Sequence, residues 1–147
     1  MKYISTRGLA TPKILTEILL GGLAPDGGLF LPEEYPQVTR KEFDEWRNLS
    51  YADFVFAIMS KFAPDIPAAD LKAITDKTYT AKVYRNALAD SDTRQIAPLR
   101  TLKPGLHILE LPNGPTLAFK DMAMQLLGNL FEYLLTSFPR SASLPLS

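Results

Sequence analysis

Lys120 combines a reactive side chain with a place in the sequence that is unfavourable for a purely structural lysine. It follows the turn-forming residues 113–115 and opens an amphipathic helix predicted to reach Leu134. Unpaired N–H groups in a first helical turn carry about half a positive unit charge and disfavour another cation by roughly 0.3–1 kcal/mol. An ammonium there should release its proton more readily, and a neutral amine can form a Schiff base with a carbonyl carbon. Lys120 is therefore a candidate carbonyl-binding residue, although spacing alone more commonly describes an ordinary lysine directed toward Asp121 or solvent.

The other residues that could do chemistry do not form a recognisable constellation. His107, the only histidine, lies in an apolar run and is predicted to be a hydrogen-bonded structural residue rather than a base. Asp90 and Asp92 could pair around a metal, but a solvated turn is predicted because no histidine or third carboxylate lies nearby. Cysteine is absent, which excludes disulfides and thiolate metal sites. No metal site is predicted.

Three elements must position Lys120. The apolar run 106–111 predicts a largely buried strand, and residues 113–115 predict a tight turn after it. Apolar residues then recur at helical spacing, which places Asp121 on the opposite, polar side. The predicted buried face of this helix consists of Phe119, Met122, Ala123, Leu126, Leu127, Leu130, Phe131 and Leu134.

The sequence before these elements predicts a mostly helical region. Its expected elements are a strand at 2–6, a helix capped by Thr11 with Pro12 at its first position, a turn at 25–28, a short extended run at 29–31, two helices with capping boxes at Thr39 and Ser50, and a helix from Pro67 to about Tyr79. Polar residues 85–95 then predict a loop, and residues 96–102 predict a strand before the turn at 103–105.

Composition narrows the function classes. The 147-residue chain is 46% hydrophobic, enough for one moderate core, and its sixteen basic and sixteen acidic residues cancel. This balance gives no indication of nucleic acid or an anionic membrane surface as a partner. No apolar run approaches the roughly 20 residues of a membrane span, and the first residues lack a signal-peptide hydrophobic region. We therefore expect a cytoplasmic protein.

The sequences of three motifs, which follow one another in this order along the chain, resemble one family. Residues 3–8 (YISTRG), 21–32 (GGLAPDGGLFLP) and 114–125 (GPTLAFKDMAMQ) resemble threonine synthase, a pyridoxal-phosphate enzyme family with a tryptophan-synthase-β-like fold. One position departs from the family pattern, which usually has Phe-His before Gly-Pro-Thr, whereas this chain has Pro112-Asn113. An asparagine can replace a histidine in a structural role but not in proton transfer.

The resemblance implies an α/β fold: an N-terminal helical subdomain followed by the first strand-turn-helix unit of a pyridoxal-phosphate fold type II domain, truncated. We expect the threonine synthase N-terminal subdomain at residues 1–84 and the start of the catalytic domain at 85–135. Residues 136–147 have loop composition, do not continue the family pattern and are expected to be a disordered tail. The chain is thus expected to be an N-terminal fragment that lacks the Gly-rich phosphate loop and the remainder of the catalytic domain.

The resemblance also implies a function in threonine biosynthesis. Lys120 would hold pyridoxal 5′-phosphate in a lyase that converts O-phospho-L-homoserine and water into L-threonine and phosphate. Lys2, Ser5, Thr6 and Arg7 are conceivable anion contacts only because of their charges, hydroxyls and clustering. The fragment alone is expected to be inactive. The alternative is a truncated noncatalytic homologue, or a remnant that binds a partner through its unfinished sheet.

Overall fold

The computed structural model describes residues 1–86 and 95–137. The chain begins with a small antiparallel sheet in which Tyr3 of the first strand pairs with Pro32 of the second. Tyr3 also exchanges two backbone hydrogen bonds with Lys13, at 2.8 and 3.0 Å, on the far side of the first strand. The bounds are β1 (Tyr3–Ser5), α1 (Leu15–Gly21) and β2 (Phe30–Pro32).

The predicted start of α1 is wrong. Thr11 and Pro12 were expected to cap and open it, but the helix begins at Leu15 after Ile14 as its N-cap. The backbone of Lys13 is instead committed to Tyr3, so the preceding residues are extended. The local capping signal was therefore overridden by a pairing with a distant residue.

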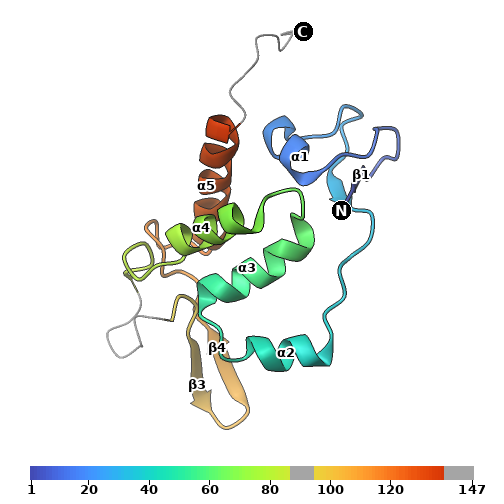
Figure 1. Ribbon diagram of the computed structural model, residues 1–147. Coiled ribbons are helices and arrows are strands. Elements are labelled where there is room, and N and C mark those ends of the chain that lie inside the picture. The colour runs from blue at the N-terminus through green and yellow to red at the C-terminus, as the bar shows by residue number, and fades with distance from the viewer. Residues whose placement is uncertain (87–94, 138–147) are drawn as a thin grey trace.

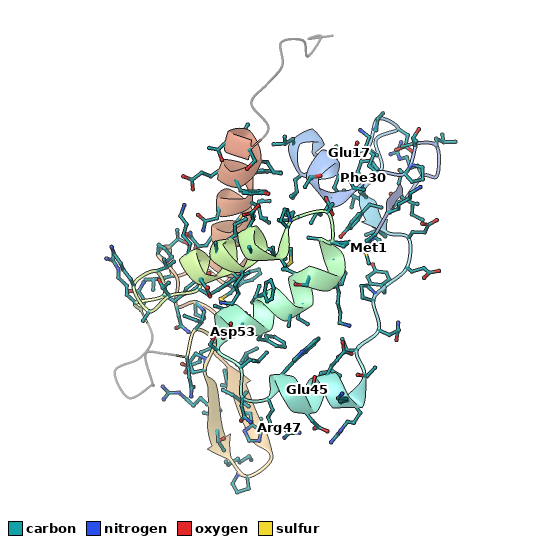
Figure 2. All side chains as sticks on the ribbon, in the orientation of Figure 1. Met1, Glu17, Phe30, Glu45, Arg47 and Asp53 are labelled. Carbon is teal, nitrogen blue, oxygen red and sulfur yellow. The ribbon has the colours of Figure 1, made fainter. Side chains whose placement is uncertain are left out.

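Three helices follow, and local sequence signals determine where they begin. Thr39 and Ser50 accept hydrogen bonds from the backbone N–H groups of Glu42 and Asp53, at 3.2 and 3.1 Å, as predicted N-caps. The return bond that completes a capping box is found at Thr39, whose N–H donates to the Glu42 carboxylate at 2.7 Å. Figure 2 shows side chains filling the space between the first two of these helices, where Trp46 meets Phe54 edge to face with 5.9 Å between ring centroids. The bounds are α2 (Arg40–Trp46), α3 (Tyr51–Phe62) and α4 (Ala68–Thr78).

The last helix, α5 (Asp121–Ser137), joins the C-terminal part of the chain to the helices before it. It packs against α4 and also contacts α1 (Figure 1). One buried cluster contains Leu71 of α4, Tyr84 after it, and Leu126 and Leu130 of α5. The core therefore includes residues from both sides of the predicted boundary at 84/85, and the division into two domains stays a prediction.

The strands β3 (Leu99–Lys103) and β4 (Leu106–Leu109) form an antiparallel hairpin that extends away from the helices (Figure 1). Gly105 takes a φ of 77° in the predicted turn, a conformation that glycine adopts without strain. The prediction of a largely buried strand at 106–111 is wrong for β4, because all four of its residues are exposed. Neither face of this hairpin is covered along β4 within the described structure.

Two expectations fall on residues outside this description. The paired carboxylates Asp90 and Asp92 lie in the undescribed segment 87–94, and the tail prediction mostly concerns residues 138–147. Residues 136 and 137 belong to α5. A search of the described helices found none that is long and apolar enough to cross a membrane.

Candidate active site around Lys120

Lys120 lies immediately before α5 rather than within its first turn, one position earlier than predicted. Its carbonyl oxygen accepts hydrogen bonds from the N–H groups of Ala123 (3.0 Å) and Met124 (2.9 Å). Lys120 is therefore the N-cap of the helix, and its side chain is exposed. The geometry presents an amine to solvent at a defined helix terminus.

Asp121 is buried, with only 3% of its surface exposed. Its carboxylate accepts a hydrogen bond from the Thr116 N–H at 2.8 Å and from the Thr116 hydroxyl at 3.0 Å. Asp121 was predicted on the polar side of the helix, and it is nevertheless buried because the chain before the helix folds back over it. Phe119 was predicted to be buried and is 65% exposed, so the core-facing stripe of this region begins inside α5.

Gly114 allows this folded-back arrangement. A Cβ atom added at Gly114 would lie 2.4 Å from the Asp121 Cβ and 2.7 Å from its Cγ, which is closer than side chains pack. Glycine is therefore required here by close approach and not by an unusual φ. We call residues 114–120 the lysine loop, because they run from this contact to Lys120.

Two buried tyrosines hold the start of α5 from the other side. The Tyr84 hydroxyl donates to the Asp121 carbonyl oxygen at 2.9 Å, and the Tyr79 hydroxyl donates to that of Met122 at 2.7 Å. Their rings stack with 5.7 Å between centroids. Burial raises the pKa of both phenols well above the ordinary value of 10.0. Both hydroxyls therefore remain donors at neutral pH.

Known proteins match this chain in sequence and in structure. The family model described as the threonine synthase N terminus matches residues 2–79, more than half of the chain. The chain belongs to the threonine synthase family. Threonine synthase from Methylobacillus glycogenes is 57% identical over 135 residues, which cover 92% of this chain and 28% of the relative. The predicted family membership is thereby confirmed.

Solved structures of threonine synthases match the fold described above. A pyridoxal-phosphate-bound threonine synthase from Brucella melitensis superimposes with a TM-score of 0.80 at 40% identity, covering 93% of this chain and 28% of that one. The yeast enzyme gives a TM-score of 0.78 at 42% identity, covering 92% of this chain and 26% of that one. The predicted α/β fold class is confirmed as the N-terminal region of such structures. The chain spans between a quarter and a third of the length of these relatives.

Asn113, where the family resemblance leads one to expect histidine, has a structural role. It is 4% exposed, and its amide nitrogen donates to the carbonyl oxygens of Glu110 (3.0 Å) and Ile96 (3.2 Å). Its own carbonyl oxygen accepts from the Asn86 N–H at 3.2 Å. These bonds fix the strand end that leads into the lysine loop. A pocket of about 350 Å³ lies here, lined by Asn86, Glu110, Pro112, Asn113 and Leu117.

The first family motif forms a separate cluster around Asp26. The Ser5 hydroxyl donates to the Asp26 carboxylate at 2.7 Å, and the Arg7 guanidinium donates to the Asp26 carbonyl oxygen at 3.1 Å. The hydrogen bond from Ser5, with others from the N–H groups of Gly28, Leu9 and Ala10, holds the pKa of Asp26 below its usual value. The contacts described for this cluster bind the turn to β1, and none of them reaches Lys120. A role for Ser5 and Arg7 as anion contacts stays a prediction.

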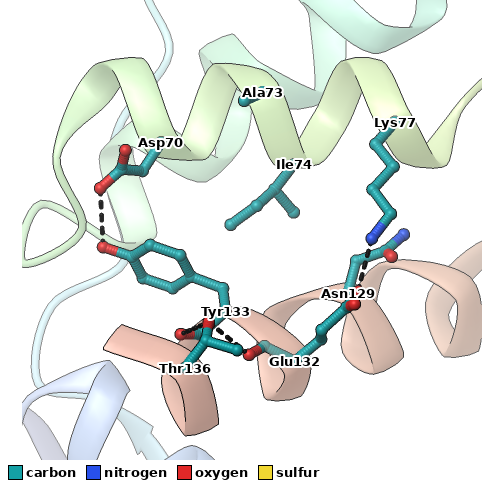
Figure 3. A pocket seen from close by; sticks show the side chains of 8 residues that line it. All are labelled: Asp70, Ala73, Ile74, Lys77, Asn129, Glu132, Tyr133 and Thr136. Atoms are coloured by element: carbon teal, nitrogen blue, oxygen red, sulfur yellow. Dashed lines mark hydrogen bonds and ion pairs between the residues drawn. The ribbon is translucent and has the colours of Figure 1, made fainter. Parts of the chain in front are cut away.

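A second polar pocket, of about 260 Å³, lies between α4 and α5 (Figure 3). Two pairs of its polar groups join α4 to α5: the Tyr133 hydroxyl donates to Asp70 at 2.8 Å, and Lys77 forms an ion pair with Glu132. Such pairing ties the two helices together. The residues lining it are Asp70, Ala73, Ile74, Lys77, Asn129, Glu132, Tyr133 and Thr136.

His107 lies on the exposed hairpin and takes part in a cross-strand contact. Its Nδ1 is 2.9 Å from the Thr101 hydroxyl, and these two residues are paired in the strand register. The prediction of a hydrogen-bonded residue is confirmed. Sequence reasoning missed Tyr79, Tyr84 and Thr116. The Gly-Pro-Thr motif before the lysine pointed to Thr116, and no pattern pointed to the two tyrosines.

Proposed function

We propose that this chain provides the N-terminal part of a threonine synthase in which Lys120 binds pyridoxal 5′-phosphate. The observation that carries the proposal is the exposed Lys120 amine at the end of a rigidly anchored loop, in a chain of this family. The related Brucella melitensis structure contains pyridoxal phosphate by its own description. The residues present fit the carbonyl end of such a cofactor, since an amine without a charged partner among the described residues can attack a carbonyl carbon.

The reaction proposed is conversion of O-phospho-L-homoserine and water to L-threonine and phosphate, a carbon–oxygen lyase reaction. Bound pyridoxal phosphate supplies an electron sink for the substrate carbon atoms. Lys120 holds the cofactor through its carbonyl carbon and, when released, its amine moves protons to and from the substrate. The lysine loop fixes the starting point of that amine. The cysteine-free sequence fits a cytoplasmic enzyme.

The proposal assigns the rest of the active site to further protein. The chain spans about 28% of its Methylobacillus relative, and groups that bind the cofactor phosphate and the substrate are expected in the remaining length. The exposed hairpin is where we expect that remainder to pack, since Leu99, Leu106 and Leu109 are 62%, 44% and 54% exposed. Residues 1–147 alone are therefore expected to be inactive.

The experiment joins residues 1–135 of this chain to the remaining part of the Methylobacillus glycogenes enzyme. After incubation of the chimera with pyridoxal phosphate and reduction with borohydride, peptide mapping should find a stoichiometric label on Lys120. In a separate assay, the purified, unreduced chimera should release phosphate from O-phospho-L-homoserine. Lys120→Ala should abolish both, whereas Lys103→Ala in the exposed hairpin should retain both. The proposal is wrong if the chimera folds and its label is unaffected by Lys120→Ala.

One observation favours a second function, a noncatalytic protein that binds a partner. The hairpin exposes apolar side chains on both sides of the strand pair, as a docking surface does. The same chimera separates the two hypotheses. A well-folded chimera that binds the cofactor and turns over substrate excludes decay of the site within this chain, whereas a folded chimera that does neither supports the noncatalytic reading.

A further inference from the structure

We propose that Asp121 is a positioning residue for Lys120, acting through its hydrogen bonds to Thr116. We call this contact the Thr116–Asp121 pair. The inference rests on the proposed function of Lys120, because it assigns to Asp121 the task of fixing where the cofactor-binding amine begins. Neither residue is proposed to touch the cofactor or the substrate.

The first argument is that the Thr116–Asp121 pair closes the lysine loop at both ends. Thr116 lies four residues before Lys120 and Asp121 directly after it, and the Asp121 carboxylate accepts both the N–H and the hydroxyl of Thr116. The charged acceptor is almost fully buried, where such hydrogen bonds are stronger than in water. Lys120 is thus held on both sides while its own side chain remains exposed.

The second argument is that the loop contains a strained residue that needs support. Leu117 has a φ of 58°, in the left-handed region that side chains other than asparagine, aspartate and glycine rarely adopt. It is 63% exposed, so burial of its own side chain does not explain this conformation. Strain of this kind persists where the surroundings determine the backbone, and it clusters at functional sites. The Thr116–Asp121 pair, one residue away, provides that constraint.

The third argument concerns the helix N-cap. An N-cap residue normally supplies a side-chain oxygen to the first unpaired N–H groups, and serine, threonine, aspartate and asparagine are preferred for that reason. Lysine has no acceptor and cannot do so. Asp121 lies in the first turn, where its negative charge favours the positive end of the helix, and its carboxylate accepts hydrogen bonds from Thr116 rather than from the helix N–H groups. The N–H groups of Asp121, Met122 and Ala123 are bonded instead to the carbonyl oxygens of Ala118, Phe119 and Lys120. The end of the lysine loop therefore completes the start of the helix, and fixing the loop also fixes the residue from which the helix begins.

The fourth argument is that Asp121 is anchored through its backbone as well. The Tyr84 hydroxyl bonds the Asp121 carbonyl oxygen, and Tyr84 is 1% exposed within the core cluster. The residue that grips the lysine loop is therefore itself attached to the segment after α4. A displacement of Asp121 would move the lysine loop relative to the core.

The first test uses the whole 147-residue chain and needs no cofactor. Asp121→Asn keeps the size of the side chain but removes its charge, and Thr116→Val removes the hydroxyl, whereas Thr116→Ser retains it. Loss of the pair should accelerate amide hydrogen exchange in the lysine loop by about tenfold or more, the equivalent of about 1.4 kcal/mol. Exchange in the buried part of α4, at Leu71 and Thr75, should change by less than about twofold, and Thr116→Ser should match the parent chain.

The second test asks whether the pair positions the amine, using the chimera described above with the same variants. We expect Asp121→Asn and Thr116→Val to lower kcat and the visible absorption of the lysine-bound cofactor by about tenfold, with KM for O-phospho-L-homoserine changed by less than about threefold. Thr116→Ser should restore both. A purely structural pair would alter loop exchange but leave absorption and kcat intact, and that result would overturn the inference.

The two tests distinguish failure of this inference from failure of the proposed function. Unchanged exchange in the lysine loop, or equal acceleration throughout α4, would reject the Thr116–Asp121 pair as a local constraint whatever the cofactor does. A parent chimera that folds but places no label on Lys120 would reject the proposed function, and with it the assignment of Asp121 as a positioning residue. The exchange result would then describe a structural contact only.

Discussion

Tyr84→Phe tests how strongly the core holds the residue next to Lys120. The substitution removes one hydroxyl, which donates to the Asp121 carbonyl oxygen at 2.9 Å, and leaves the buried ring and its stacking on Tyr79 in place. A net neutral hydrogen bond contributes about 0.5–1.5 kcal/mol. The ring is 1% exposed, so water cannot replace the lost donor without entering the core. We therefore expect the free energy of unfolding to fall by about 1 kcal/mol.

Urea unfolding followed by circular dichroism measures this change, with the midpoint expected to fall at a constant slope. A chain of this size should also melt about 2–4 °C lower for each kcal/mol lost. Tyr35→Phe is the matched control, because Tyr35 is 61% exposed and its hydroxyl has no hydrogen-bond partner among the described residues. Its removal should change stability by less than about 0.3 kcal/mol.

A double-mutant cycle then asks whether Tyr84 and Thr116 act on Asp121 together. Both residues bond the same residue, one through its carbonyl oxygen and the other through its carboxylate. Contacts within one network commonly couple by about 0.5 kcal/mol or more, whereas independent sites add. Tyr84→Phe and Thr116→Val should therefore be non-additive. Additive losses, or a Tyr84→Phe loss no larger than that of Tyr35→Phe, would refute the reasoning.

Three further outcomes are expected. Stability should rank Gly above Leu above Val at position 117, because a left-handed conformation costs an ordinary residue roughly 1–2 kcal/mol and a β-branched one more; equal urea midpoints would contradict the strain. Gly114→Ala should cost about 1–3 kcal/mol by overlap with Asp121, measured in the same way, and a neutral result would show that the turn can shift freely. Burial raises the pKa of Tyr79 and Tyr84, so their stabilisation is complete below the unfolded value of 10.0 and is lost as pH rises above it. Melting temperatures measured from pH 8 to about 11 should therefore decline above about 10, and a flat profile would contradict this assignment.

Sequence reasoning succeeded where a structure is determined by neighbouring residues. The capping boxes at Thr39 and Ser50 predicted two helix starts because the residues involved lie within one turn of each other. The turn at Gly105 was predicted for the same reason. Lys120 was predicted in the first turn of the helix and lies one residue before its start. Its role as the cofactor lysine stays a prediction, which came from the family resemblance of the motif.

Sequence reasoning failed where a distant partner decides the outcome. Threonine is a preferred N-cap residue, so Thr11 was predicted to start a helix. The chain after Thr11 is extended instead, because Lys13 pairs with Tyr3. The spacing of apolar residues places Asp121 on the polar side of its helix. The loop before the helix nevertheless folds over Asp121, and Thr116 of that loop donates a hydrogen bond to its carboxylate. Periodicity describes which way a side chain points from its own helix. It contains no information about a loop that returns to cover that side.

The hairpin shows the same limit in the opposite direction. An apolar run predicts burial because apolar surface is unfavourable in water, by about 25 cal/mol for each Å². In β4, however, Ile108 and Leu109 are 46% and 54% exposed. The apolar sequence of β4 and its exposure agree with each other if further protein packs on this strand. The proposed function requires such protein, because it assigns the rest of the active site to residues outside these 147. Under the proposed function, the strand pattern reflects an environment that the rest of the enzyme supplies, whereas contacts within this chain already hold the lysine loop.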